Sequence, residues 1–147
     1  MRTSIGLGVL GAMGFAALTA CGNGGTAGTG GTTGTGGGST KVNGCDPTTA
    51  ADHTADATTA VVFGGTTGLK YAPACIKIKK GHSVKWTGDF TAHPLSGGLD
   101  GAKDAASPIT EATTGMSQTI TFPATGTFGF FCEVHFSSGM EGAVFVE

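Results

Sequence analysis

The sequence has little charge, few cysteines and only one long apolar run. Charged residues make up 12% of the 147 residues, and the single arginine, Arg2, lies in the first segment. Without that segment, the lysines and acidic residues leave a net charge of about −3. This balance gives no basis for binding nucleic acid. The apolar run, within residues 1–20, is too short and too weakly flanked for a lasting transmembrane helix.

Residues 1–20 instead have the pattern of a secretory signal peptide, with one positive charge followed by an apolar stretch. The segment Leu18-Thr19-Ala20-Cys21 resembles the lipobox of bacterial lipoproteins. This resemblance implies that Cys21 is lipidated after cleavage and anchors the protein in the bacterial envelope, facing the periplasm or the exterior. Gly22 stands where an Asp would resemble an inner-membrane retention signal, which favours the outer membrane. The alternative is an ordinary signal peptide followed by an unrelated cysteine.

Residues 21–41 follow the signal and are nearly all Gly and Thr. Such a stretch buries too little apolar surface to offset its ordering entropy, so we expect a flexible tether. The remaining residues, 42–147, are predicted to form the folded domain. Asp46-Pro47 is a helix-start signal, and residues 46–58 could hold a short helix.

The domain shows alternation of apolar and polar residues with period two, which is typical of strands. Ile76 and Ile78 alternate with lysines, and Val84 and Trp86 follow the same pattern. Glycine-rich turn signals, including Gly97-Gly98, separate such runs, and residues 99–116 are interpreted as a polar connection. The pattern predicts an all-β fold, an antiparallel β-sandwich with Greek-key connections.

A thiol, an imidazole and a thioether occur within nine residues near the C-terminus. Cys132, His135 and Met140 form a Cys-x2-His-x4-Met pattern after an aromatic strand. Each residue alone would more simply be a core or turn residue. Their joint spacing favours a metal site. A thiolate and two imidazoles with a weak axial thioether suit copper, whereas a structural zinc site has little use for a thioether.

The cysteine count supports this interpretation. If Cys21 is lipidated, three cysteines remain in an oxidising compartment, and copper ligation explains why Cys132 stays unpaired. Cys45 and Cys75 are then left to form a disulfide. The competing pairing of Cys132 with either of them would abolish the site.

The second imidazole has to come from elsewhere in the chain. His53 and His82 lie in polar or turn segments, and both are interpreted as solvated surface residues. His93 follows a strand and precedes Pro94, which restricts the backbone before it to extended conformations. A ligand from a distant strand end, meeting the C-terminal loop, would hold a metal stiffly at one pole of the sandwich.

Two segments carry a resemblance to a known family. The first runs from Tyr71 to His93, and the second runs from Thr121 through Cys132 to Val146. They resemble the small blue copper proteins, or cupredoxins, such as plastocyanin, pseudoazurin and azurin. The resemblance implies one type 1 copper held by four ligands, which are His93, Cys132, His135 and Met140.

The resemblance also implies that the ring edge of His135 is the electron portal, within an apolar patch that has Phe136 and Leu95 at its rim. The alternative for Phe136 is a simple packing residue. Val134 stands where many members have Pro. We therefore expect a monomeric electron-transfer protein, with unidentified redox proteins as partners. The alternative is a copper-binding module for storage, delivery or resistance. An enzyme is disfavoured, because nothing offers a second metal centre.

Several lysines fall close together in the first half of the domain. They are Lys70, Lys77, Lys79, Lys80 and Lys85. They could form a docking face for a partner, but the simpler interpretation is that they are the solvated side of a sheet.

Overall fold

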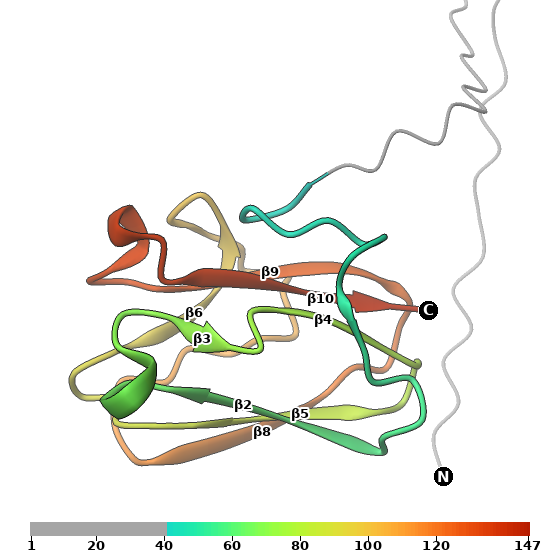
Figure 1. Ribbon diagram of the computed structural model, residues 1–147, viewed down its shortest axis with the longest axis horizontal. Helices are drawn as coiled ribbons and strands as arrows, with labels where there is room; N and C mark the ends of the chain where they lie inside the picture. Colours follow the sequence, from blue (N-terminus) through green and yellow to red (C-terminus); the bar gives the residue numbers. More distant parts are fainter. Residues whose placement is uncertain (1–40) are drawn as a thin grey trace, which may run out of the picture. The chain divides into compact units, whose positions relative to one another are not determined.

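The computed structural model describes residues 41–147. These residues form ten strands and two short 3-10 turns, and the strands lie in two layers (Figure 1). The expected signal peptide, the lipidated Cys21 and the tether up to residue 40 fall outside the described residues. Within residues 41–147, no helix is long and apolar enough to cross a membrane.

The larger sheet has six strands in the order β1-β4-β10-β9-β6-β7. They are β1 (Ala51–Asp52), β4 (Cys75–Ile78), β6 (Leu95–Leu99), β7 (Ala102–Lys103), β9 (Gly126–Cys132) and β10 (Glu141–Val146). The smaller sheet has the order β3-β2-β5-β8. It contains β2 (Thr58–Phe63), β3 (Tyr71–Ala72), β5 (Ser83–Thr87) and β8 (Ser117–Thr121). The 3-10 turns are η1 (Gly65–Thr67) and η2 (Phe136–Ser138).

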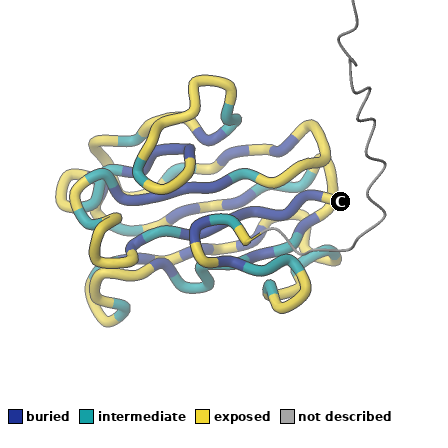
Figure 2. The backbone as a smooth tube through the Cα atoms, turned by 90° about the horizontal axis from the view of Figure 1, so that it is seen from above, coloured by how far each residue is buried: buried dark blue, intermediate teal, exposed yellow. Residues whose placement is uncertain are grey.

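The core lies between the two sheets, where the period-two pattern placed it. Buried and exposed residues alternate strictly along β2, and Figure 2 shows exposed loops at the strand ends. Each fully buried aliphatic or aromatic side chain contributes about 1.5–3 kcal/mol to stability. The sandwich is therefore a stiff scaffold for a site at one end. Its largest fully buried side chains include Trp86, Phe90, Phe122, Phe130, Ile76, Ile78 and Leu95.

The sandwich prediction is confirmed, but the pairing within the sheets is mixed rather than purely antiparallel. β2 pairs parallel with β5, and β4 pairs parallel with both β1 and β10. The remaining pairs are antiparallel. A strand with one buried face alternates in the same way whichever direction its neighbour runs, so the residue pattern could not distinguish the two arrangements.

Two connections also differ from expectation. Residues 46–58 contain no helix, and residues 51–52 form the edge strand β1 instead. Residues 95–103 form a hairpin of β6 and β7, so Gly97-Gly98 lies within a strand and is not the turn that its sequence predicts. The turn itself is Asp100-Gly101, with φ of 49° and 78°. Asp-Gly with two positive φ angles is typical of a two-residue hairpin turn.

The N-terminal arm, residues 41–54, packs on the larger sheet away from the main core. The expected disulfide between Cys45 and Cys75 is present and ties the arm to β4. Cys45, Ala143 and Phe145 form a second small apolar cluster there. The arm, in cyan in Figure 1, is thereby fixed to the domain.

Candidate metal centre

Neighbouring strands bring two of the candidate ligands together. β6 pairs antiparallel with β9, with Leu95 opposite Cys132. His93 lies two residues before Leu95, so its ring reaches the end of β9. The Glu133 amide donates to the Pro94 carbonyl at 2.9 Å, which continues this pairing beyond Cys132.

The loop between β9 and β10 supplies the other candidates. The Cys132 amide donates to the Met140 carbonyl at 2.9 Å, which closes the loop at its base. The amides of His135 and Met140 donate to the carbonyls of Cys132 and His135, each at 3.2 Å. Gly139 adopts the left-handed conformation that ends η2. These backbone bonds hold the residues 132–140 in one compact turn.

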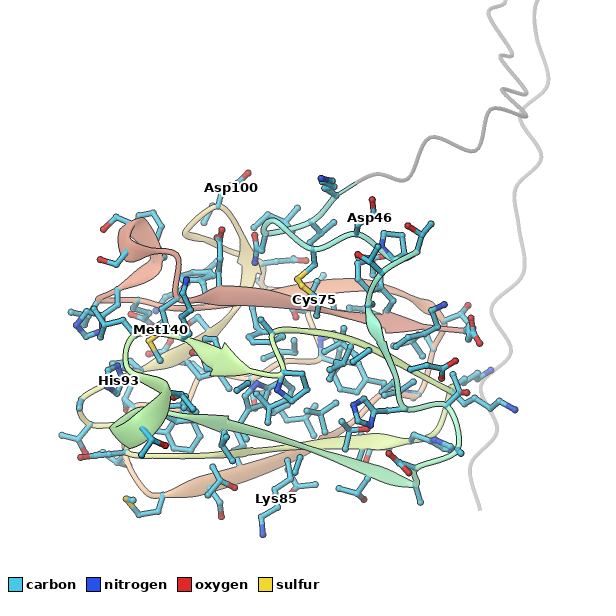
Figure 3. All side chains as sticks on the ribbon, in the orientation of Figure 1. Asp46, Cys75, Lys85, His93, Asp100 and Met140 are labelled. Atoms are coloured by element: carbon cyan, nitrogen blue, oxygen red, sulfur yellow. A yellow bond between two sulfur atoms is a disulfide. The ribbon has the colours of Figure 1, made fainter. Side chains whose placement is uncertain are left out.

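Three potential ligand atoms converge at this pole. The two Nδ1 atoms of His93 and His135 lie 3.1 Å apart. Cys132 Sγ lies 3.4 Å from His135 Nδ1 and 4.0 Å from His93 Nδ1. Among the described residues, this is the cluster of His, Cys, Asp and Glu that could hold a metal ion. His93 and Met140 are labelled in Figure 3 at this end of the sandwich.

Burial and charge suit these groups to metal binding. Cys132 is fully buried and forms no disulfide. Burial, and then the neighbouring His135, lowers the pKa of His93 below its ordinary value, against a smaller opposing effect of Asp89. His93 is therefore neutral at pH 7, which is the form that binds metals. Met140 is also fully buried, in the same apolar cluster as Cys132.

The donor set fits copper. Two nitrogens and a sulfur around one ion, at the ordinary bond lengths of roughly 2.0–2.3 Å, would lie about 3.5–3.8 Å apart in a trigonal plane. The observed separations of 3.1, 3.4 and 4.0 Å bracket that range. A thiolate, two imidazoles and a nearby thioether are the ligands of a blue copper site.

Sequence comparison also indicates a copper-binding protein. A sequence model of the copper binding proteins of the plastocyanin/azurin family matches residues 57–147. The chain belongs to this family. It is a cupredoxin, a copper-binding protein of an electron-transfer family, and the site takes one copper.

Known members of the family show how far the similarity extends. The chain is 32% identical over 96 residues to the chloroplastic plastocyanin of Tetradesmus obliquus, covering 59% of this chain and 66% of that one. The present chain therefore spans just under two thirds of the length of that plastocyanin. Pseudoazurin from Methylobacterium extorquens AM1 shares 25% identity, with a TM-score of 0.47 over 60% of this chain and 74% of that one. Amicyanin from Paracoccus versutus shares 27% identity, with a TM-score of 0.44 over 67% and 90% of the two chains.

The structure also places the other residues that the sequence singled out. His53 pairs with Asp56 at 2.8 Å, and neither it nor His82 belongs to the cluster. Phe136, proposed for the portal, is 39% exposed. The prediction that Leu95 lies at the rim of the portal is wrong, because this side chain is fully buried opposite Cys132.

The lysines do not gather on one face of one sheet. Lys77 lies in β4 of the larger sheet and Lys85 in β5 of the smaller sheet, and the outer faces of these two sheets point in opposite directions. Lys70, Lys79, Lys80 and Lys85 are exposed. The solvated-surface interpretation therefore accounts for them better than a docking face.

Tyr71 lies beside the site, and its sequence position alone does not indicate an individual role. Its ring packs edge-on against Phe130, with centroids 4.9 Å apart, and it is only 3% exposed. Its hydroxyl has no hydrogen-bond partner. Burial, and then the negative charge of a Cys132 thiolate, raises the pKa of Tyr71. In the sequence Tyr71 is only the start of the segment that resembles the family, and nothing there signals a buried hydroxyl.

Proposed function

We propose that this protein is a one-electron carrier with a type 1 copper held by His93, Cys132, His135 and Met140. The observation that supports the proposal most directly is the convergence of two imidazole nitrogens and a free, buried thiol at one pole. Bound copper would supply the Cu(I)/Cu(II) couple. We infer that the protein has no substrate of its own and is not an enzyme.

The chain contributes rigidity at this pole. His93 lies in the segment just before β6, and the other three side chains come from the loop closed between Cys132 and Met140. Both segments are fixed by backbone hydrogen bonds to neighbouring strands, so the ligand atoms have little freedom to rearrange when the charge changes. Burial of the Cys132 sulfur keeps water away from the thiolate.

His135 is the proposed electron portal. It is partly exposed, whereas Cys132 and Met140 are fully buried. Val134 and Phe136, on either side of it, are 61% and 39% exposed. An apolar rim around a ligand ring favours brief docking of redox proteins, which we propose as the partners of a monomeric carrier.

We further propose that the protein is tethered to the bacterial envelope through lipid on Cys21, facing the periplasm or the exterior, with the outer membrane favoured. The proposal rests on the lipobox-like segment before Cys21 and on the Gly/Thr composition of the residues after it.

The visible spectrum of the copper-loaded full chain tests the site. We expect intense absorption from the copper–thiolate bond, and we expect Cys132→Ser to bleach it. Met140→Leu is the matched control, since it keeps the thiolate and similar side-chain volume and should remain coloured. A colourless wild-type protein with stoichiometric copper would exclude the proposed site.

A second measurement separates a carrier from a copper donor. A carrier keeps its copper through repeated cycles of chemical reduction and oxidation in the presence of a competing copper chelator. Loss of copper to the chelator within one cycle would instead support storage or delivery.

A further inference from the structure

The N-terminal arm lies outside the segment that matches the family, yet it contains a buried polar side chain. Asn43 is 8% exposed and adopts a left-handed backbone with φ of 46°. Its Nδ2 lies 3.0, 3.1 and 3.1 Å from the carbonyl oxygens of Phe130, Gly98 and Gly142, which share its two hydrogens as acceptors. Those carbonyls belong to β9, β6 and β10, so one amide group joins three strands of the larger sheet.

The absence of a side chain at Gly129 lets the Asn43 amide come close to the strands. A Cβ atom added at Gly129, in β9, would lie 2.9 Å from Asn43 Nδ2 and 2.7 Å from Leu99 Cδ2. The nearest atom to this Cβ would be the Gly98 carbonyl oxygen of β6, and real Cβ contacts essentially never come so close. A larger residue at position 129 would therefore clash with β6 as well as with the Asn43 amide. The Gly-rich strands thus form a recess in which the Asn43 side chain sits.

The other end of the same amide contacts the turn that follows β6. Asn43 Oδ1 accepts a hydrogen bond from the Asp100 amide at 3.0 Å. Asp100 and Gly101 form the turn of the β6–β7 hairpin. The arm therefore holds this turn through a buried, fully used side chain.

The β6–β7 turn packs against Phe136, which belongs to the proposed portal. A Cβ atom added at Gly101 would lie 2.6–2.8 Å from three ring atoms of Phe136, so the ring packs directly on the glycine backbone. Phe131 contacts the same ring edge-on, with centroids 6.1 Å apart. Phe136 follows His135 in the chain, and its carbonyl accepts the Gly139 amide at 2.8 Å.

We propose that Asn43 is a positioning residue for the ligand loop, acting through the Asp100-Gly101 turn and Phe136. The arm thereby fixes the segment that carries His135, although it contacts no ligand. The expected effect on electron exchange rests on the proposed function, whereas the structural coupling does not. The mechanical coupling from Asn43 to Phe136 exists with or without copper.

Amide hydrogen exchange in the copper-free full chain tests the coupling. The variant is Asn43→Gly, because glycine accepts the positive φ without strain. We expect the Asp100 amide to exchange about tenfold faster or more, and the Ser138 and Gly139 amides to exchange faster with it. The β2–β5 ladder, in the other sheet, should keep its exchange rates.

Thr54→Ala is the matched control. It removes the side-chain hydrogen bond from Thr54 to Asp52 at the other end of the arm, keeps the backbone one, and leaves the Asp100 turn untouched. A uniform acceleration of all amides in Asn43→Gly, or acceleration at Asp100 alone, would overturn the proposal.

Electron self-exchange of the copper-loaded chain provides the second readout. We expect Asn43→Gly to slow it by about 2- to 30-fold, the range of ordinary coupling through a packed contact. In a Phe136→Ala background the same substitution should have no further effect, because the transmitting ring is gone. Additive effects in the double variant would contradict the route. A chain that binds no copper would refute the proposed function while leaving the exchange experiment to decide the coupling.

Discussion

At the residue scale, Tyr71 places a buried hydroxyl without a hydrogen-bond partner in the core near Cys132. A buried hydroxyl without a partner costs about 1–3 kcal/mol, and the Tyr71 hydroxyl has none. Tyr71→Phe keeps the edge-on ring contacts with Phe63 and Phe130. We therefore expect the free energy of unfolding of the copper-free chain to rise by about 1 kcal/mol, measured by urea denaturation.

Tyr71→Leu is the control for shape, because it removes the ring contacts together with the hydroxyl. It should lower the free energy of unfolding by about 1–3 kcal/mol. A loss of stability in Tyr71→Phe as well would show that the hydroxyl makes a favourable interaction, for instance with a bound water.

The same scale shows which residues a sequence can reveal. Cys132, His135 and Met140 were predictable because a short loop fixes their separation, so their spacing in sequence is also their spacing in space. His93 could be selected by its place after a strand. Asn43 could not, since asparagine before glycine is an ordinary turn signal, and its three carbonyl acceptors come from residues 55 to 99 positions away.

At the scale of elements, glycines limited the prediction of the larger sheet. β5 was predictable because Val84 and Trp86 alternate with polar residues. β6 contains Gly97-Gly98, which resemble a turn. In the structure, a Cβ atom at Gly97 would lie 2.7 Å from the Ile109 carbonyl, so glycine serves close packing there. Asp100-Gly101 was the available signal for the hairpin.

The arm is an element whose attachment can be tested. The disulfide joins Cys45 to Cys75 across a separation of 30 residues. Closing a loop of that length is worth roughly 3–4 kcal/mol in the chain-entropy account. We expect the double variant Cys45→Ala, Cys75→Ala to lose about that much unfolding free energy, measured by denaturant titration under oxidising conditions.

The copper site should survive this change, because none of its ligands lies in the arm or in β4. The visible spectrum of the copper-loaded double variant is therefore the internal control. Loss of colour without global unfolding would mean that the arm is needed to assemble the site itself.

At the scale of the whole molecule, the copper domain and the proposed anchor are separate in sequence. The family match begins at residue 57, and the first candidate ligand is His93, whereas the lipobox-like segment ends at Cys21. Copper binding and attachment to the membrane should therefore be separable by mutation.

Cys21→Ala makes this separation measurable. Because stable anchoring requires the lipid chains, we expect the variant to leave the membrane fraction while keeping the visible spectrum of the wild type. The double variant Cys45→Ala, Cys75→Ala is the matched control, since it also removes cysteines but should stay with the membrane. A wild-type protein found entirely in the soluble fraction would favour an ordinary signal peptide, and a membrane-bound Cys21→Ala variant would require an anchor other than lipid on this residue.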